Sequence, residues 1–345
     1  MPSVLRGALI GCGFFAQNHL NAWRDMRSEG VELVAVCDID RAKAEAAAKT
    51  FGIPRAYDDA AALFAGETLD FVDIATRMDT HEALVALAVR HSVRVIVQKP
   101  LAPDWASCVR IVSGAKAAGV PMAVHENFRF QTPMMAVREV LSSGAIGTPS
   151  WARFAFRTGY DVYRTQPYFR HEERLVILDV GIHVLDIARV FMGEVAHLSC
   201  ETQRRDARNR AEDTATIMMR HESGAVSLVE ATYESRESPD PFPQTLLVIE
   251  GDRGAIRMNR DFHLVVTSDG TMTERRVSSP LLPWTSEPWH VAQESVLLTQ
   301  RAIIGAWRAG REAETSGEDN LKTFALVEAA YLAAAERRAV VPAAQ

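Results

Sequence analysis

Apolar residues in the first third of the chain gather in short runs, each with the length and continuity of a strand buried on both faces of a sheet: 4–10, 31–37, 69–75, 93–97 and 121–124. The segments between these runs have compositions compatible with helices: 17–28, 41–50, 81–91 and 105–118. Strands that alternate with helices predict a parallel sheet with right-handed crossovers. We therefore predict an α/β domain with a doubly wound parallel sheet over residues 1–125.

The pattern changes near residue 131. A helix near 133–142 is followed by alternating or strand-rich runs at 151–158, 198–203, 214–220, 226–233, 245–250, 255–258 and 264–267. Residues 251–254 indicate a hairpin loop between two of these strands. We predict an α+β domain over residues 126–345, with an open, mostly antiparallel sheet and helices on one face. A last helix, opened by a capping box at Thr315 and Glu318, would be able to pack back on the first domain.

Composition limits the partners of the chain. Its 345 residues are 48% hydrophobic and 24% charged, as in an ordinary globular protein large enough for two domains. The 38 Lys and Arg against 44 Asp and Glu give a net charge of −6, which provides no basic surface for nucleic acid. A run of about eighteen apolar residues, the length that spans a membrane, is missing from the sequence. We expect neither nucleic acid nor a membrane as a partner.

Cysteine spacing points to a reduced compartment. The four cysteines form no Cys-x-x-Cys pair and lie far apart at Cys12, Cys37, Cys108 and Cys200. This spacing argues against a disulfide framework, a redox dithiol or a zinc ribbon, so we assign no metal site. Residues 9–12 could pass for a lipoprotein cleavage site, but the charged leader is too thin and the apolar segment contains too many glycines for that interpretation. We expect a cytoplasmic protein.

A glycine-rich turn follows the first predicted strand. In the G-x-G-x-x-A sequence of residues 11–16, Gly11 allows a sharp turn, Gly13 lets the backbone approach a pyrophosphate, and Ala16 lets the helix pack close to its strand. Asp38 stands about 22 residues after Ala16, at the end of the second strand, where the dinucleotide fingerprint places an acid that binds the ribose hydroxyls. The first domain is therefore predicted to be a Rossmann dinucleotide-binding domain.

Asp38 also has a plainer interpretation as a helix cap or turn residue, because Asp40 and Arg41 lead directly into the next helix. The surrounding strand, turn and helix favour the cofactor role. An acid at this position repels a 2′-phosphate, so NAD is favoured over NADP, although the nearby Arg41 keeps NADP open.

Ligands of such sheets bind outside the carboxyl ends of the strands. Three loops follow strand ends and should line one crevice: 76–81, 98–100 and 125–130. From these loops and the glycine turn, we take as cofactor-binding candidates Phe14, Phe15, Thr76, Asp79, His81, Gln98 and Lys99, in addition to Gly11, Gly13, Ala16, Asp38 and Arg41.

Four features together resemble the glucose-fructose oxidoreductase and inositol dehydrogenase family, often called Gfo/Idh/MocA. They are the glycine turn, the Gln-Lys-Pro loop at 98–100, the Asn-Phe-Arg stretch at 127–129, and the sequence DVGIHVLD at 179–186. The resemblance covers nearly the whole chain. There are two departures: Gln98 replaces the family's usual glutamate, and residues 77–79 are Arg-Met-Asp where the family commonly has Pro and Asn.

The resemblance implies catalytic roles for Lys99, Asp179 and His183. His183 would be the general acid or base, Lys99 would stabilise the developing alkoxide, and Asp179 would bind a substrate hydroxyl or orient His183. On a helix, Asp179 and His183 would share one face, and Asp186 could orient the imidazole. Without the resemblance, Lys99 would be interpreted as a surface lysine and His183 as a structural histidine.

Further residues are candidates for binding substrate hydroxyls: Asn127, Arg129, Asp161, Tyr163 and Gln166, together with Asp179 and His183. Each of the first five is equally well explained as an ordinary surface or packing residue. We assign no function to the charged segment 204–213.

The resemblance implies an NAD(P)-dependent dehydrogenase that acts on a secondary alcohol of a sugar, cyclitol or related polyol, in a homodimer or homotetramer. Two alternatives share the fold: an NAD-dependent glycoside-cleaving enzyme and a catalytically silent ligand-sensing regulator. Lys99 with Asp179 and His183 argues against the regulator, which needs no proton relay. The sequence does not identify the sugar.

Overall fold

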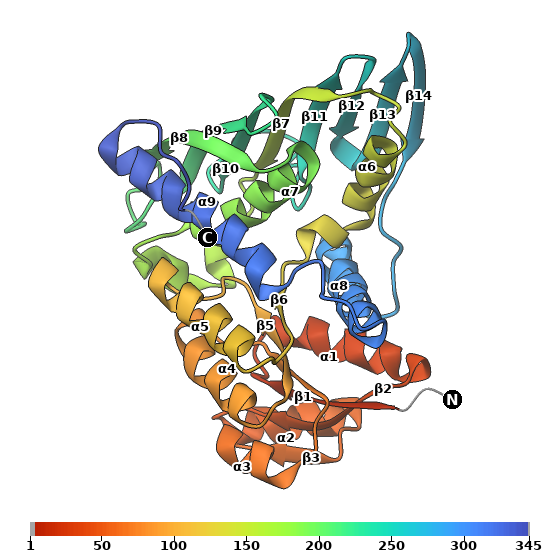
Figure 1. Cartoon of the computed structure of the whole chain (residues 1–345), viewed down its shortest axis with the longest axis vertical. Helices are drawn as coiled ribbons and strands as arrows, with labels where there is room; N and C mark the ends of the chain where they lie inside the picture. The colour runs from red at the N-terminus through yellow and green to blue at the C-terminus, as the bar shows by residue number, and fades with distance from the viewer. Residues whose placement is uncertain (1–3, 344–345) are drawn as a thin grey trace. The chain divides into compact units, whose positions relative to one another are not determined.

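The computed structural model describes residues 4–343, which form two compact units (Figure 1). The first unit contains residues 4–126 and 296–321, and the second contains residues 127–295 and 322–343. Between residues 4 and 343, every helix is too short or too polar to cross a membrane.

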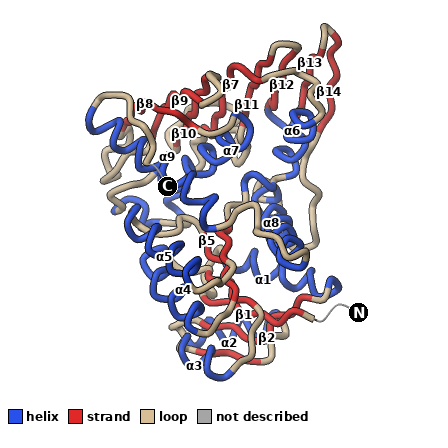
Figure 2. Tube along the Cα trace, viewed as in Figure 1, coloured by secondary structure: helices blue, strands red, loops and turns tan. Residues whose placement is uncertain are grey.

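The first unit is built on a six-stranded parallel sheet with the strand order β3-β2-β1-β4-β5-β6. Its strands are β1 (Leu5–Ile10), β2 (Val31–Cys37), β3 (Arg55–Tyr57), β4 (Phe71–Ile74), β5 (Arg94–Gln98) and β6 (Met122–His125). Helices lie on both sides of these strands (Figure 2): α1 (Ala16–Asp25), α2 (Arg41–Phe51), α3 (Ala60–Gly66), α4 (His81–Arg90) and α5 (Trp105–Ala117). The predicted doubly wound parallel sheet is confirmed. The strand order reverses direction between β1 and β4, which is where such sheets bind ligands.

The second unit is built on an eight-stranded sheet with the order β14-β13-β12-β11-β7-β10-β9-β8. Its strands are β7 (Pro149–Arg157), β8 (Val195–Gln203), β9 (Thr214–His221), β10 (Val226–Thr232), β11 (Leu246–Gly251), β12 (Gly254–Asn259), β13 (His263–Ser268) and β14 (Thr271–Arg276). Only β7 and β10 pair in parallel, so the predicted mostly antiparallel sheet is confirmed. The predicted hairpin joins β11 to β12.

One face of this sheet is covered by helices. Figure 1 shows α6 (Thr132–Ser142) and α7 (Ile182–Met192) on the same side of the strands. The strand side chains that face these helices form the core, and Phe154, Val229 and Ile249 are fully buried. Alternate residues of the same strands are only half-buried, so the two faces differ in burial as a one-sided sheet requires.

Two helices have residues in both units: α8 (His290–Arg308) and α9 (Gly317–Glu336). The capping box predicted for the last helix is wrong by one residue. The hydroxyl of Ser316, immediately before α9, accepts a hydrogen bond from the backbone N–H of Asp319 at 3.2 Å. The cap therefore uses Ser316 in place of Thr315.

Candidate active site

The glycine turn after β1 has the geometry that a dinucleotide requires. Gly11 has a φ of 96°, and a Cβ there would lie 2.7 Å from the carbonyl oxygen of Ala75, so only glycine fits. A Cβ at Gly13 would have no described atom within 4 Å, so the backbone at this point is open to close approach. Ala16 is buried at the start of α1. The turn therefore fits a bound pyrophosphate.

Asp38 fixes this turn from the end of β2. One carboxylate oxygen accepts the backbone N–H of Cys12 at 2.7 Å, and the other accepts that of Asp40 at 2.9 Å. Helix α2 is capped by Asp40, whose side chain accepts the N–H of Ala42, so Asp38 is not the helix cap. The nearby Arg41 is exposed and pairs with Glu45 at 2.8 Å.

The loop after β4 carries three of the cofactor candidates. Thr76 accepts a hydrogen bond from the hydroxyl of Thr80 at 2.7 Å, and Asp79 lies 3.6 Å from Arg77. His81 is fully buried, with its ring nitrogens 3.2 Å from the carbonyl oxygen of Thr76 and 3.0 Å from that of Leu101. Burial lowers the pKa of His81. This histidine therefore ties the loop after β4 to the loop after β5.

The side chains of the glycine turn differ sharply in exposure. Phe14 is 71% exposed and Phe15 is 37% exposed. The ring of Phe15 packs edge-on against His19, with their centroids 5.7 Å apart. Both phenylalanines remain available for contact with a ligand.

Lys99 directly follows β5 and is half-buried, and its bond to Pro100 is cis. The preceding Gln98 is buried, and both ends of its amide have protein partners. Its oxygen accepts the backbone N–H of Lys99 at 2.7 Å, and its nitrogen lies 3.0 Å from Nε2 of His19. The Gln98 side chain is therefore held by hydrogen bonds inside the first unit.

Asp179 and His183 belong to the second unit. Asp179 lies in a π-helical turn, Ile177–Gly181, that continues directly into α7, where His183 is the second residue. The carboxylate of Asp179 accepts a hydrogen bond from the hydroxyl of Tyr233. The ring of His183 is stacked on Phe128, with their centroids 3.8 Å apart and their planes 2° apart.

The environment of Tyr233 explains why it donates to Asp179. Burial, reinforced by the carboxylate of Asp179, raises the pKa of Tyr233 well above its ordinary value. The phenol therefore keeps its proton near neutral pH. Sequence reasoning missed this residue, because a tyrosine at the end of a strand run carries no local mark of its partner.

Asp186 was expected to orient the imidazole of His183, but its carboxylate serves another contact. Asp186 is fully buried and accepts two hydrogen bonds from the Arg129 guanidinium, one from Nε at 2.7 Å and one from Nη2. The hydroxyl of Thr323 donates to the same carboxylate at 2.7 Å. Arg129, a substrate candidate, is thus the buried partner of Asp186.

The remaining substrate candidates also have protein partners in the second unit. Asn127 is buried and donates to the hydroxyl of Ser295 at 2.7 Å. Asp161 is exposed and accepts the backbone N–H of Arg164 at 3.2 Å, at the start of a short helix, Val162–Arg164. Gln166 accepts the hydroxyl of Tyr168 at 2.7 Å.

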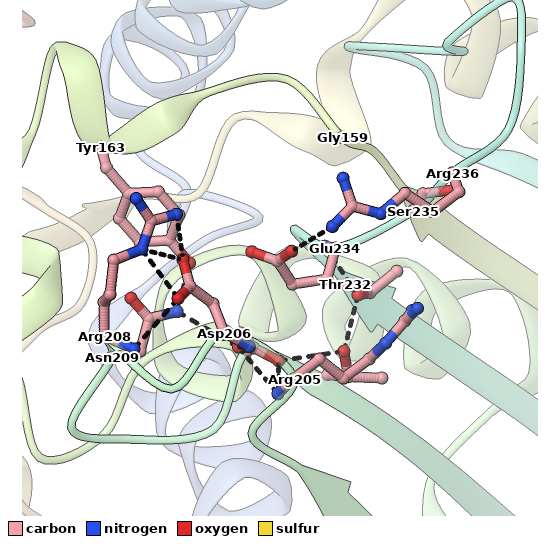
Figure 3. Close-up of polar contacts among 12 residues, drawn as sticks. Gly159, Tyr163, Arg205, Asp206, Arg208, Asn209, Thr232, Glu234, Ser235 and Arg236 are labelled. Atoms are coloured by element: carbon pink, nitrogen blue, oxygen red, sulfur yellow. Dashed lines mark hydrogen bonds and ion pairs between the residues drawn. The ribbon is translucent and has the colours of Figure 1, made fainter.

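Tyr163 is held by the segment 204–213, to which the sequence analysis gave no function. Its hydroxyl accepts a hydrogen bond from Asn209 at 2.6 Å, and Figure 3 shows Asn209 and Asp206 on the loop that faces the tyrosine. Asp213 organises this loop, because it accepts the backbone N–H groups of Arg205 and Asp206 and the side-chain amide of Asn209. Burial raises the pKa of Tyr163 to about 12. A phenol that accepts one hydrogen bond retains a proton to donate.

Tyr163 and Tyr233 are linked through the same loop. The backbone N–H of Tyr233 donates to the carbonyl oxygen of Asp213 at 3.0 Å, while its hydroxyl reaches Asp179. The loop therefore helps to position Tyr233 on Asp179, the candidate catalytic acid, and holds Tyr163 through Asn209.

Comparisons with known proteins match both parts of the chain. Residues 5–126 match the family described as "Oxidoreductase family, NAD-binding Rossmann fold". Residues 134–257 match the "GFO/IDH/MocA C-terminal domain".

Individual relatives match over almost the whole chain. A D-apiose dehydrogenase of Rhizobium rhizogenes is 49% identical, and the match covers 97% of each chain. A solved oxidoreductase from Agrobacterium radiobacter, in complex with NAD+, L-tartaric acid and magnesium, is 48% identical, with a TM-score of 0.96 and 98% of each chain covered. A myo-inositol 2-dehydrogenase of Thermotoga maritima is 25% identical, over 97% of this chain and 98% of its own.

Proposed function

Because the chain belongs to the Gfo/Idh/MocA family of oxidoreductases, we propose that it oxidises a secondary alcohol of a sugar or polyol with NAD, and that Lys99 and His183 handle the proton of the reacting hydroxyl. The chain is an NAD-dependent dehydrogenase of the sugar and polyol class. The observation that carries the proposal is full-length likeness to named sugar and polyol dehydrogenases, joined to the open backbone at Gly13.

The leading substrate is D-apiose. The likeness to the D-apiose dehydrogenase of Rhizobium rhizogenes runs over 97% of both chains, so it includes both units of the fold. The likeness to the inositol dehydrogenase is half as strong by identity and makes cyclitols the second class to test.

The first unit supplies the residues that would hold NAD. The pyrophosphate would lie on the turn from Gly11 to Ala16, and the carboxylate of Asp38 would accept the ribose hydroxyls. Bound NAD would supply the hydride acceptor. Arg41 is paired with Glu45, which favours NAD over NADP at this position. Thr76 and Asp79 would line the same cofactor site, and His81 would support it from behind.

In the proposed chemistry, the imidazole of His183 takes the hydroxyl proton while the carbon loses its hydride. Imidazole suits this role because it titrates near neutral pH, and a well-placed general base contributes roughly 10²- to 10⁴-fold. The Lys99 ammonium donates a hydrogen bond to the reacting oxygen and stabilises the developing alkoxide. Asp179, whose carboxylate accepts a hydrogen bond from the hydroxyl of Tyr233, orients His183 or binds a second substrate hydroxyl.

Other polar groups of the second unit would bind the remaining substrate hydroxyls. Tyr163 is the strongest of these candidates because its hydroxyl, although it accepts a hydrogen bond from Asn209, keeps its own proton to donate to a substrate. Asn127, Asp161 and Gln166 are weaker candidates, since each already has a partner within the chain.

We propose a homodimer or homotetramer as the working form. The face of the eight-stranded sheet that points away from α7 carries Trp151, Leu228 and Val248, which are only half-buried in the single chain. Apolar groups at this exposure on a sheet face are typical of a surface covered by a second subunit. The four free, buried cysteines support a reducing location such as the cytoplasm.

The test of the function is a panel assay. Purified protein would be mixed with NAD or NADP, separately, and with D-apiose, common monosaccharides, inositols or sugar acids, while the absorbance of reduced nicotinamide is followed. Stoichiometric NADH with D-apiose is expected. A glycoside-cleaving relative would return its nicotinamide unchanged, and a silent regulator would bind a sugar without turnover, so either pattern would replace the proposal.

The residue assignment has its own test. Lys99→Ala and His183→Ala should each lower kcat by at least about 10²-fold, since each removes a group that acts on the reacting oxygen. Binding of NADH, followed by its fluorescence, should survive in both variants. Wild-type turnover in either variant would remove that residue from the mechanism while leaving the panel result intact.

A further inference from the structure

A hydrogen-bond chain connects Lys99 to buried side chains in the interior of the first unit, to which Lys99 itself belongs. The side-chain oxygen of Gln98 accepts the backbone N–H of Lys99 at 2.7 Å, and the Gln98 amide nitrogen lies 3.0 Å from Nε2 of His19. Nδ1 of His19 lies 2.7 Å from the carboxylate of Asp73. His19 and Asp73 are fully buried, and Gln98 is 8% exposed. The chain thus joins the end of β5 to α1 and β4.

The backbone N–H of Lys99 determines the direction of every other hydrogen bond in this hydrogen-bond chain. The backbone N–H of Lys99 is a donor, so the Gln98 oxygen must face it and the Gln98 amide nitrogen must face His19. That amide nitrogen donates, so Nε2 of His19 must accept and carry no proton. The single proton of a neutral His19 then lies on Nδ1 and is donated to Asp73. One assignment therefore fits the three hydrogen bonds that link Lys99, Gln98, His19 and Asp73.

Asp73 anchors the chain as a carboxylate. The indole N–H of Trp23 donates to the same oxygen as His19, at 2.7 Å, and the amide of Gln300 lies 3.5 Å away. Burial alone would raise the pKa of Asp73, but the hydrogen bonds that its carboxylate accepts from His19 and Trp23 favour the charged form, and the pKa lies below its ordinary value. A carboxylate with these donors keeps one orientation over the neutral pH range.

The other titratable group that faces His19 is His125 on β6. The two rings lie with their centroids 4.3 Å apart. Burial, together with His19, lowers the pKa of His125 to about 3, so His125 is neutral at the pH of any assay near neutrality. Of Asp73 and His125, two titratable groups in contact with His19, Asp73 is therefore the one that is charged near neutral pH.

We propose that Gln98 and His19 are positioning residues that hold Lys99 for the reaction, through a buried hydrogen-bond chain anchored on Asp73. The inference rests on the proposed role of Lys99. A lysine reaches its target on a flexible four-carbon stem, so its ammonium is placed reproducibly only when its backbone is fixed. Gln98 fixes that backbone, and the tautomer of His19 fixes Gln98.

The kinetic test is a double-mutant cycle. His19→Phe keeps a ring in the space and removes both hydrogen bonds, and it should lower kcat by about 10-fold or more, because small displacements of a reacting group are costly. His19→Gln, which can accept from Gln98 and donate to Asp73, should recover most of the rate. In a Lys99→Met background, His19→Phe should cause no further loss, since His19 acts through Lys99. The Kd for NADH of the His19→Phe variant should stay within about twofold of the wild-type value.

The matched control is His221→Phe in the second unit. His221 is as buried as His19, and its ring nitrogens lie 2.7 Å from the carbonyl of Gly193 and 2.8 Å from the hydroxyl of Ser227. Its loss should lower stability without changing kcat. Equal losses from His19→Phe with and without Lys99 would overturn the inference, as would an unchanged kcat in His19→Phe. Full activity of Lys99→Met would instead overturn the proposed function.

A spectroscopic test needs neither substrate nor coenzyme and remains decisive if His19→Phe does not fold. Nitrogen-15 NMR of labelled histidines, in the protein without NAD, should show His19 with a protonated Nδ1 and an unprotonated Nε2. In Gln98→Glu the new carboxylate can only accept, so Nε2 should gain a proton and His19 should become an imidazolium. A wild-type His19 protonated on Nε2 would contradict the proposed direction of the chain.

Discussion

At the residue scale, the hydrogen bond from Tyr233 to Asp179 can be tested for a role in catalysis as opposed to a role in stability alone. The phenol is 5% exposed and donates to a carboxylate that the mechanism uses. Tyr233→Phe removes that proton while keeping the ring. A hydrogen bond to a charged group is worth about 1.5–3 kcal/mol, so kcat should fall by about 10- to 100-fold if Asp179 needs this donor to act. Steady-state kinetics with the accepted substrate would measure the loss.

The control for this prediction is Tyr57→Phe in the first unit. Tyr57 also donates its hydroxyl to a carboxylate, that of Glu67, at 2.9 Å, but it lies outside the candidate site. This variant should keep the wild-type kcat. Loss of activity in Tyr57→Phe equal to that in Tyr233→Phe would show that the effect comes from general destabilisation.

How much of the site could be predicted from the sequence depends on the range of each contact. Gly11, Gly13 and Asp38 were identified because their roles follow from local backbone geometry and a fixed spacing along the chain. The partners of Asp186 and Gln98 were not, because Arg129 and His19 lie 57 and 79 residues away in sequence. A pairing at that distance is decided by tertiary packing, which a single sequence does not encode locally.

At the element scale, the strands that were predicted from the sequence have buried side chains, and those that were missed are short or exposed strands at the edge of a sheet. Buried strands such as β2 and β5 leave continuous apolar runs, and they were predicted within a residue or two. Strands β3 and β14 were missed. The first has three residues and the second is exposed along its whole length, and both lie at the edge of a sheet. An edge strand without a buried face leaves no apolar pattern.

The Arg129–Asp186 pair links three elements of the second unit: the short helix Phe128–Phe130, α7 and α9. Asp186→Asn leaves the buried guanidinium of Arg129 without its countercharge, and breaking such a pair costs about 3–5 kcal/mol. Urea unfolding at pH 7 should therefore show a large loss of stability. Asp269→Asn, at an exposed ion pair with Arg253, is the control and should cost little.

The pH dependence of this loss has a definite sign. Burial alone would raise the pKa of Asp186, but Arg129 outweighs it and lowers the pKa below the ordinary value. A group with a lowered pKa in the folded state contributes its full stability above the pKa of the unfolded state, near 4, and loses it as the pH falls through the folded value. The difference between wild type and Asp186→Asn should thus be equal at pH 7 and pH 6. A difference that shrinks over this range would contradict the charged pair.

At the scale of the whole molecule, the outer face of the eight-stranded sheet is the surface that we propose pairs with a second subunit. Leu228 on β10 and Val248 on β11 both stand beside Arg153 of β7 in the strand register. Arg153 is paired with Glu230 at 2.6 Å, so its charge is balanced within the face. A face with half-buried apolar side chains and balanced charges is suited to pairing with an identical face across a two-fold axis.

Leu228→Arg places an unbalanced charge on this face, beside Arg153 of β7. Two such faces brought together would bury like charges, which costs several kcal/mol, so the assembly should dissociate. Sedimentation velocity of the wild type should give a dimer or tetramer, and the variant should sediment as a monomer of 38.1 kDa. Leu332→Arg, on an exposed position of α9 at 43% exposure, should keep the wild-type assembly. A wild type that is monomeric at all concentrations would mean that this sheet face is exposed to solvent in the working protein.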